Sequence, residues 1–283
     1  MTPVRFVVVP QWQGSPSSRA MRLAEGAYAI LGDLPSTATT MVEVPVGAGD
    51  SLGTRVHRLS SVLTIAESVG RELRTDDSPA IVVGGDCGVE FAAVRHAVTP
   101  RTAVVWFDAH PDLHSPRSSE SGAFSGMVLR ALIGDATEDL PTIGPGPTPE
   151  PLDPARVVLA GARSYDDSED SYIESRHVRT VSSLDFDPAE VITAVEESGA
   201  TEVYLHVDLD VLDPGVIEGL LDPQPFGLEP GVLIETITAL KQRFTLVGAG
   251  LCSFAPVDAA AASDDMGTIL RILGALARET PAP

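Results

Sequence analysis

Short apolar runs alternate with amphipathic stretches along most of this chain. The apolar runs are rich in valine and bounded by turn residues, as is typical of buried strands; they lie at Arg5–Val9, Met41–Val46, Ala80–Val83, Thr102–Phe107, Val157–Ala160, Val203–Val207 and Thr245–Leu251. Apolar residues at helical spacing predict helices at Ser17–Leu31, Leu59–Leu73, Val89–Val98, Gly126–Ile133, Pro188–Ser198, Pro230–Arg243 and Met266–Ala277. This alternation predicts an α/β fold, with a mostly parallel sheet covered by helices on both faces.

No linker or internal repeat interrupts the alternation, so we expect residues 1–283 to form a single domain. The acidic segment Asp135–Pro154, which holds many proline and glycine residues, is expected to be a surface loop. In parallel sheets, ligands bind beyond the carboxyl ends of the strands. Residues that directly follow the predicted strands are therefore the first candidates for a functional site.

Charge and cysteine content narrow the classes of partner. The formal net charge is −21, which argues against nucleic acid or an anionic membrane as a partner and suits the attraction of cations. The two cysteines, Cys87 and Cys252, are too few for a disulfide scaffold. No signal-peptide pattern opens the chain, and no apolar run approaches the roughly 18 residues of a membrane span. We therefore expect a soluble, cytoplasmic protein.

Two clusters of ligand-type side chains follow predicted strands. Asp108, His110 and Asp112 come directly after one apolar run, and Asp208 and Asp210 come directly after another. Alternate residues of an extended segment point to the same side, so we expect each cluster to converge. Acids grouped at the end of such apolar strands would repel one another unless a cation neutralised them. The pattern therefore predicts a site for two metal ions and metal-assisted hydrolysis.

A third motif, Gly84-Gly85-Asp86-Cys87, follows the predicted strand at Ala80–Val83. The glycines permit a tight turn, and Cys87 would then open a helix. A thiol at a helix N-terminus is expected to have a lowered pKa, so Cys87 could be a thiolate ligand or a nucleophile. The alternative is a small buried cysteine without chemical function.

Together, and in this order, the three motifs resemble the signature of the ureohydrolases, which include arginase, agmatinase and formiminoglutamase. The resemblance covers nearly the whole chain and implies a three-layer α/β/α fold, two Mn²⁺ ions and a homo-oligomer, either a trimer or a hexamer. Carried over by position, Asp108 and Asp208 would bridge both ions. Cys87 and Asp112 would complete one metal site, and His110 and Asp210 would complete the other. The two ions would acidify a shared water to hydroxide, which attacks the carbon of a small linear amidine or guanidine.

Three positions depart from the family pattern. Cys87 replaces the usual histidine, and its softer sulfur makes Zn²⁺, Fe²⁺ or Co²⁺ alternatives to Mn²⁺. Ser125 replaces a histidine linked to proton shuttling, so His114 or His206 would have to substitute for it. Ser253 replaces a glutamate that pairs with the substrate guanidinium, which makes plain arginine a doubtful substrate.

The resemblance also assigns a substrate-binding side to the site. Asp166 matches an acidic position that reads the amino end of the substrate, and the alternative is a solvated acid in a loop. His114 matches a polar contact to the substrate, and Ser121 lies in the same segment as Ser125. Asp112, Ser125 and His114 are the residues expected to take part in catalysis.

Two other functions remain open from the sequence. The chain could be a metal-binding member of the family with weak or no catalysis that acts as a binding or regulatory protein, a reading favoured by Ser125 and Ser253. It could also be a deacetylase-like amide hydrolase with a single Zn²⁺, but that chemistry needs a pair of adjacent histidines, which is not visible here.

Overall fold

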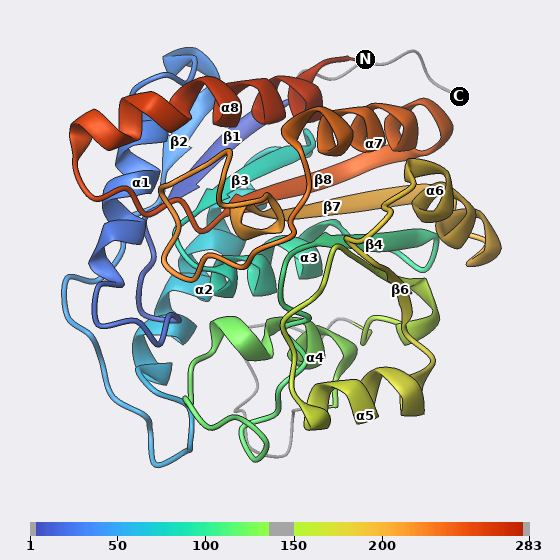
Figure 1. Cartoon of the computed structure of the whole chain (residues 1–283). Helices are drawn as coiled ribbons and strands as arrows, with labels where there is room; N and C mark the ends of the chain where they lie inside the picture. Colours follow the sequence, from blue (N-terminus) through green and yellow to red (C-terminus); the bar gives the residue numbers. More distant parts are fainter. Residues whose placement is uncertain (1–3, 136–149, 280–283) are drawn as a thin grey trace.

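The computed structural model describes residues 4–135 and 150–279. Its centre is an eight-stranded sheet in the order β2-β1-β3-β8-β7-β4-β5-β6 (Figure 1). Every neighbouring pair of strands is parallel. The strands are β1 (Arg5–Val9), β2 (Thr39–Met41), β3 (Ala80–Gly84), β4 (Thr102–Phe107), β5 (Val157–Ala160), β6 (Arg179–Val181), β7 (Glu202–Asp208) and β8 (Thr245–Cys252).

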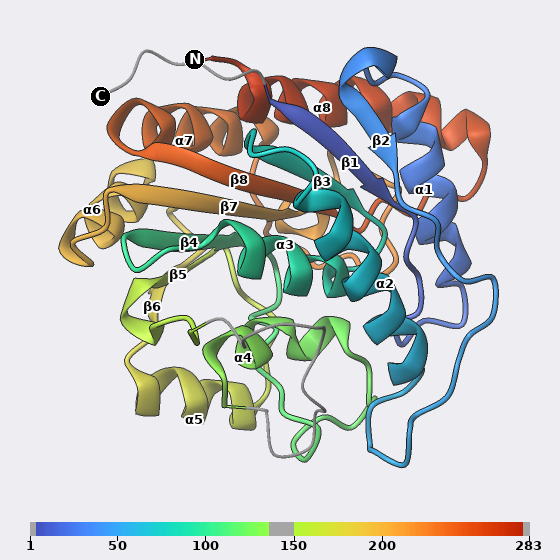
Figure 2. The same ribbon diagram turned by 180° about the vertical axis from the view of Figure 1, so that it is seen from behind.

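Helices cover both faces of the sheet, which confirms the three-layer α/β/α prediction (Figures 1 and 2). Successive side chains of each strand point to opposite faces of the sheet, so each face has its own hydrophobic core. On β1, Phe6 and Val8 pack in the core of one face, and Val7 and Val9 pack in the core of the other. The first face is covered by α1 (Met21–Leu31), α6 (Pro188–Glu197), α7 (Pro230–Arg243) and α8 (Ala259–Ala277). The second is covered by α2 (Leu59–Leu73), α3 (Glu90–Ala97), α4 (Val128–Ile133) and α5 (Asp167–Arg176).

The order of the strands determines where the motifs meet. The motifs follow β3, β4, β7 and β8, which are consecutive in the sheet as β3-β8-β7-β4 although they are far apart in the sequence. Because the strands are parallel, their carboxyl ends share one edge of the sheet. The chemistry-bearing residues are therefore gathered over the middle of this edge, as expected for a parallel sheet.

Several predicted elements differ from those observed. The second strand covers Thr39–Met41 rather than Met41–Val46, and the first helix begins at Met21 rather than Ser17. The last helix begins at Ala259, because the Asp258 carboxylate caps it by accepting hydrogen bonds from two backbone amides. Helix α5 and strand β6 were not predicted. Helix α5 is polar along most of its length, so hydrophobic periodicity does not reveal it.

Two further predictions concern the acidic loop and a possible membrane span. Of the expected loop Asp135–Pro154, residues 136–149 lie outside the described residues. In the described part of the chain, no helix is both long and apolar enough to cross a membrane.

Candidate metal centre and active-site pocket

All six predicted metal ligands line a single pocket at the carboxyl edge of the sheet. The pocket has a volume of about 360 Å³ and is bounded by Cys87, Asp108, His110, Asp112, Asp208 and Asp210. The four carboxylates and Cys87 are buried. Carboxylate oxygens grouped in this way are the ligands that divalent cations prefer in proteins.

Ligand atoms of the pocket lining, together with those of the buried His206 behind it, form two overlapping groups. Cys87, Asp108, Asp112 and His206 each offer one ligand atom within 4.8 Å of the others. Asp108, His110 and Asp210 form a second group by the same measure. Asp108 belongs to both groups, which is the arrangement needed for a carboxylate shared between two ions.

Asp108, His110 and Asp112 all line this pocket, as expected. They divide between the two groups, because the chain turns after His110 and Asp112 has a left-handed backbone with φ of 51°. The Oδ2 atom of Asp112 is buried without a hydrogen-bond partner among the described residues. Burial and the neighbouring carboxylates raise the pKa of Asp112 well above its usual value. Such an orphaned acid fits a cation site.

Both carboxylate oxygens of Asp108, unlike Oδ2 of Asp112, accept hydrogen bonds. Trp106 donates a hydrogen bond from Nε1 to Oδ2 (3.2 Å), and the His110 backbone amide donates to Oδ1 (2.6 Å). Burial alone would raise the pKa of Asp108, but the facing imidazoles of His110 and His206 outweigh burial and lower it. Asp108 is therefore an ionised, oriented carboxylate at the point where the two groups meet.

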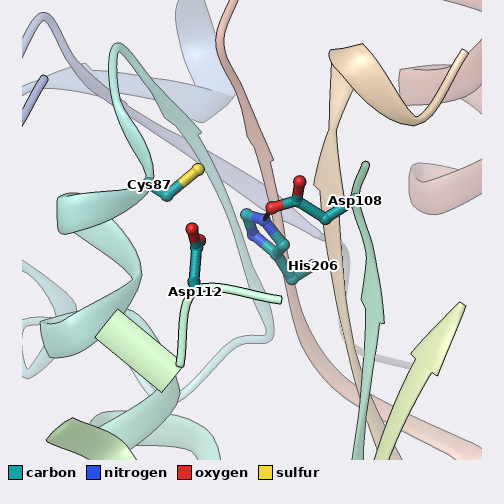
Figure 3. A group of neighbouring side chains, drawn as sticks. All are labelled: Cys87, Asp108, Asp112 and His206. Carbon is teal, nitrogen blue, oxygen red and sulfur yellow. Dashed lines mark ion pairs between the residues drawn. The ribbon is translucent and has the colours of Figure 1, made fainter. Parts of the chain in front are cut away.

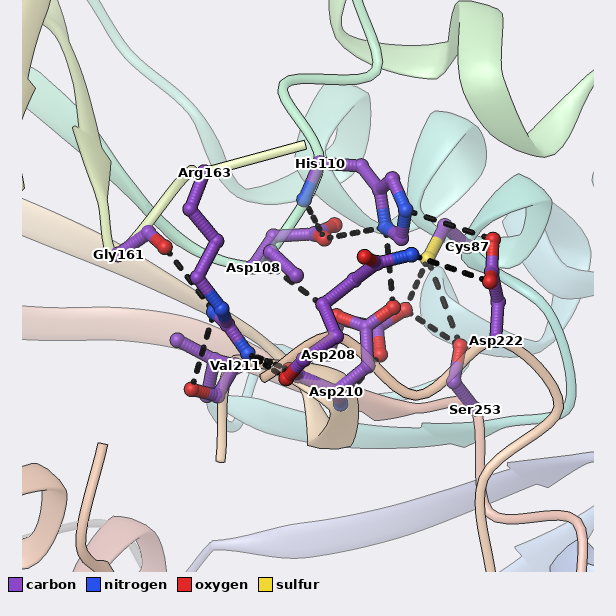
Figure 4. A network of polar contacts seen from close by, with 12 residues as sticks. Cys87, Asp108, His110, Gly161, Arg163, Asp208, Asp210, Val211, Asp222 and Ser253 are labelled. Carbon is purple, nitrogen blue, oxygen red and sulfur yellow. Dashed lines mark hydrogen bonds and ion pairs between the residues drawn. The ribbon is translucent and has the colours of Figure 1, made fainter. Parts of the chain in front are cut away.

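Asp208 lies beside Cys87 but belongs to neither group of ligand atoms. Its Oδ2 accepts hydrogen bonds from Cys87 Sγ at 2.8 Å and from Ser253 Oγ, and its Oδ1 accepts one from the Asp210 backbone amide (Figure 4). Burial and the charges of Asp210 and Asp108 raise the pKa of Asp208. The bridging role of Asp208 stays a prediction.

The pKa of Cys87 differs from the expectation. Contact with the Cys252 thiol, burial and the Asp208 carboxylate together raise the pKa of Cys87 well above its usual value. A helix N-terminus cannot compensate for these effects, because the turn Cys87–Val89 is short and the thiol is enclosed. These contacts favour the protonated thiol of Cys87 over the thiolate. Cys87 becomes a ligand only by exchanging its proton for a metal ion.

The glycine-rich turn that carries Cys87 is tightly enclosed. A Cβ atom on Gly85 would lie 1.7 Å from the carbonyl oxygen of Gln11, so only glycine fits there. The buried Asp86 carboxylate ties the turn to the loop after β1 by accepting from the Gly14 amide (2.9 Å) and Gln11 Nε2 (2.7 Å). Asp86 is thus a structural residue that fixes the position of Cys87.

A carboxylate that no sequence pattern indicated, Asp222, lies beside His110. The Nδ1 atom of His110 lies 3.0 Å from Asp210, inside the metal group, whereas its Nε2 atom lies 3.5 Å from Asp222 (Figure 4). Metal-binding histidines commonly have their second nitrogen on a carboxylate. Asp222 follows no strand, so no sequence pattern singled it out.

We expect Asp222→Asn to weaken metal binding at the His110 site by about 10-fold or more, because the imidazole loses the charge that orients it. Competition with a chelator measures this affinity. Glu218→Gln, at another exposed acid of the same loop, is the control and should change the affinity little. An unaltered affinity in Asp222→Asn would rule out the orienting role.

The residues predicted to contact the substrate agree with the pocket lining except for one acid. His114, Ser121, Ser125 and Ser253 all line the pocket, but Asp166 is not among its lining residues. The Asp166 carboxylate instead caps α5 by accepting hydrogen bonds from the amides of Ser168 and Glu169.

The acid that does line the pocket at this point is Glu169, which sequence reasoning missed. It is buried, it accepts a hydrogen bond from the Leu113 amide, and its Oε2 lies 3.5 Å from His114 Nε2. Glu169 was missed because it lies on the unpredicted helix α5. Burial raises the pKa of Glu169.

Comparison with known proteins agrees with this geometry. An arginase of Entamoeba histolytica is 32% identical over 183 residues, which cover 59% of this chain and 60% of that protein. The N(omega)-hydroxy-L-arginine amidinohydrolase of Streptomyces lavendulae is 26% identical over 265 residues, covering 92% of this chain and 89% of that protein. A crystal structure of the Entamoeba arginase superimposes with a TM-score of 0.80 at 22% identity, covering 96% of this chain and 98% of the other. The model of the Arginase family matches residues 13–271, and the chain therefore belongs to the arginase family.

Proposed function

We propose that this arginase-family hydrolase cleaves a C–N bond of a linear guanidine or amidine at a centre of two divalent metal ions. The main support is that all six predicted ligands line one pocket and that Asp108 belongs to both groups of ligand atoms. The raised pKa values of Asp112, Asp208 and Asp210, all caused first by burial, also favour a bound cation. Mn²⁺ is the metal that the family resemblance implies, and Cys87 makes Zn²⁺, Fe²⁺ or Co²⁺ alternatives.

Two bound ions would lower the pKa of a water molecule to about 7, so that hydroxide is available as the nucleophile near neutral pH. The chain's own residues orient the reactants and move protons. His114 stands in for the absent histidine at position 125, since its backbone amide bonds to the carbonyl of Gly126 at 3.0 Å and its ring lines the pocket beside Ser125. Its Nε2 faces Glu169, which orients the ring for proton delivery to the leaving amine.

The proposed substrate is an arginine derivative whose guanidine is less basic than that of arginine. Ser253 is neutral, so it cannot provide the carboxylate that a fully charged guanidinium would need. An N-hydroxyguanidine is less basic because its oxygen withdraws electron density. One relative that matches over most of this chain is named for hydrolysis of N(omega)-hydroxy-L-arginine. Glu169 is suited to the α-ammonium group of such an amino acid.

A substrate panel tests the proposal. Protein loaded separately with Mn²⁺, Zn²⁺, Fe²⁺ or Co²⁺ is assayed with N(omega)-hydroxyarginine, arginine, agmatine and formiminoglutamate, and amine release is measured. We expect kcat/KM for the hydroxylated compound to exceed that for arginine by at least about 10-fold. A protein that binds metal but releases no amine from any of these compounds would instead be the binding or regulatory protein.

Ser253→Glu should reverse this preference. A carboxylate at position 253 would pair with a guanidinium in a partly buried pocket, an interaction of about 1.5–3 kcal/mol, so kcat/KM for arginine should rise about 10- to 100-fold relative to the hydroxylated compound. Ser253→Ala is the matched control, because it removes the hydroxyl without adding charge. An equal change in the two variants would exclude a charge effect.

We also propose that the protein is a cytoplasmic homo-oligomer, a trimer or a hexamer. The resemblance to the family supports the oligomer, and two free cysteines fit a reducing compartment. Light scattering on the purified protein decides the number of subunits.

A further inference from the structure

His206 is a buried histidine whose ring nitrogens have no hydrogen-bond partners among the described residues. It lies on β7 two residues before Asp208 and points into the same group as Cys87, Asp108 and Asp112 (Figure 3). A fully buried polar group without a partner is costly, by about 1–3 kcal/mol. A carboxylate lies near each ring nitrogen, Asp108 on one side and Glu90 on the other, but neither is within hydrogen-bond range.

The distance between His206 and Asp108 suits two ligands of one metal ion. Nε2 of His206 lies 3.6 Å from Oδ2 of Asp108, beyond the N···O range of about 2.7–3.2 Å for a hydrogen bond. Two atoms that each bind one tetrahedral ion at about 2.0–2.2 Å lie about 3.4 Å apart. The observed separation therefore suits two ligands of one ion better than a hydrogen-bonded pair.

The other ring nitrogen faces a buried glutamate. Nδ1 lies 3.6 Å from Oε2 of Glu90, and the Tyr204 hydroxyl donates to the same oxygen at 2.7 Å. A contraction of about 0.5 Å would bring Nδ1 into hydrogen-bond range of Glu90. An N–H at Nδ1 that donates to Glu90 leaves Nε2 with a free lone pair, which is the form that binds a metal.

The residues that pair with His206 on the two adjacent strands leave room for Glu90 and hold the imidazole ring in place. Gly250 on β8 pairs with His206, and a Cβ atom at position 250 would lie 1.9 Å from Oε1 of Glu90. Glycine at this position therefore admits the glutamate. On the other side, Trp106 on β4 pairs with His206 and stacks on its ring, with centroids 3.6 Å apart. The ring is thus held between a glycine and an indole.

We infer that His206 is a nitrogen ligand of the metal ion at the Cys87 site and that Glu90 is the positioning residue that holds its tautomer. The inference rests on the proposed function only in requiring a bound metal. The Cys87 site then has a sulfur, a nitrogen and carboxylate oxygens as donors, whereas the second site has His110 with Asp108 and Asp210. The sulfur- and nitrogen-containing site would favour Zn²⁺, Fe²⁺ or Co²⁺ over Mn²⁺.

Counting imidazole nitrogens bound to the metal tests His206 directly. Pulsed electron paramagnetic resonance of the Mn²⁺-loaded protein should detect two coordinated imidazoles in the native chain and one in His206→Gln. His96→Gln is the control, since His96 lies on α3 and belongs to none of the groups of possible ligand atoms among the described residues, and it should keep both. The same count in His206→Gln as in the native chain would overturn the inference.

Glu90→Gln gives a second test that keeps His206 in place. It should weaken metal binding by about 10- to 100-fold, the effect typical of a residue that orients a metal ligand, while the count of two imidazoles is retained. Glu202→Gln is the matched control. Glu202 is also a buried glutamate, but it lies at the start of β7, at the end of the strand opposite Asp208, where it accepts hydrogen bonds from Thr99 and Arg101. Equal affinities in Glu90→Gln and Glu202→Gln would contradict the role of Glu90.

Neither readout involves hydrolysis, so the two proposals can fail separately. A protein with two metal-bound imidazoles that cleaves no compound of the panel would refute the proposed function alone. A protein that cleaves N(omega)-hydroxyarginine with only one bound imidazole would refute the ligand role of His206 alone.

Discussion

Asp112→Asn is expected to stabilise the metal-free protein while it abolishes metal-dependent activity. The native carboxylate is buried beside other acids, and its Oδ2 has no partner among the described residues. Removing its charge should therefore raise the free energy of unfolding of the metal-free protein by about 1–3 kcal/mol. Asparagine also tolerates the left-handed backbone found at this position. Loss of a ligand should lower kcat/KM by about 10³-fold or more.

The gain in stability should depend on pH. Because burial and nearby acids raise the folded-state pKa of Asp112, its contribution to stability is fully present below the unfolded value of about 3.9 and is lost as the pH rises through the folded-state pKa. The difference between Asp112→Asn and the native chain should therefore be large near neutral pH and vanish below about pH 4. Thermal unfolding without metal, followed at several pH values, measures it.

Added metal should reverse the order of stability, because only the native chain gains the full binding energy of the ions. Asp185→Asn is the matched control: Asp185 has a similar left-handed backbone with φ of 55° but is exposed. It should alter neither stability nor metal binding appreciably. If Asp112→Asn destabilised the metal-free protein, repulsion between the buried acids would not be the reason for its raised pKa.

Ser125→His is expected to raise kcat for the true substrate by up to about 100-fold, the lower end of what a positioned general acid contributes, because His114 already supplies part of this proton transfer. Ser125 lines the pocket beside His114, in a turn fixed by a hydrogen bond from its own amide to the Gly14 carbonyl at 3.0 Å. An imidazole at this point can deliver a proton to the leaving amine near neutral pH, whereas a hydroxyl cannot. The pH profile of kcat should gain a limb near the imidazole pKa of about 6.5.

Two further variants make this test specific. Ser121→His places an imidazole at the exposed rim of the same pocket and should give no gain. His114→Gln should lower kcat strongly in the native chain but only weakly together with Ser125→His, because the new imidazole takes over proton delivery. If Ser125→His gave no increase in any assay with a turned-over substrate, proton transfer would not limit this enzyme.

Hydrophobic periodicity was sufficient for most of the fold. The boundaries of α2, α7, β4 and β5 agree with the prediction, because each is a strongly apolar or amphipathic segment bounded by clear turn residues. It failed at α5, whose stability comes from the Asp166 cap and a few contacts such as Tyr172 rather than from an apolar stripe. The acidic character of this segment made it resemble a loop, and Glu169 was lost with it.

For the site, the sequence alone singled out the residues that are proposed to hold the metal ions, because Cys87, Asp108, His110, Asp112, Asp208 and Asp210 all belong to motifs that directly follow strands. The residue pattern by itself could not determine how they group, since that depends on which strands are neighbours and on the left-handed turn at Asp112, whereas the family resemblance implied the division that the two ligand groups show. Only the tertiary structure brought His110 next to Asp222 and His206 next to Glu90. These pairs join segments far apart in the chain, and the second exists because Gly250 leaves room for a carboxylate inside the core.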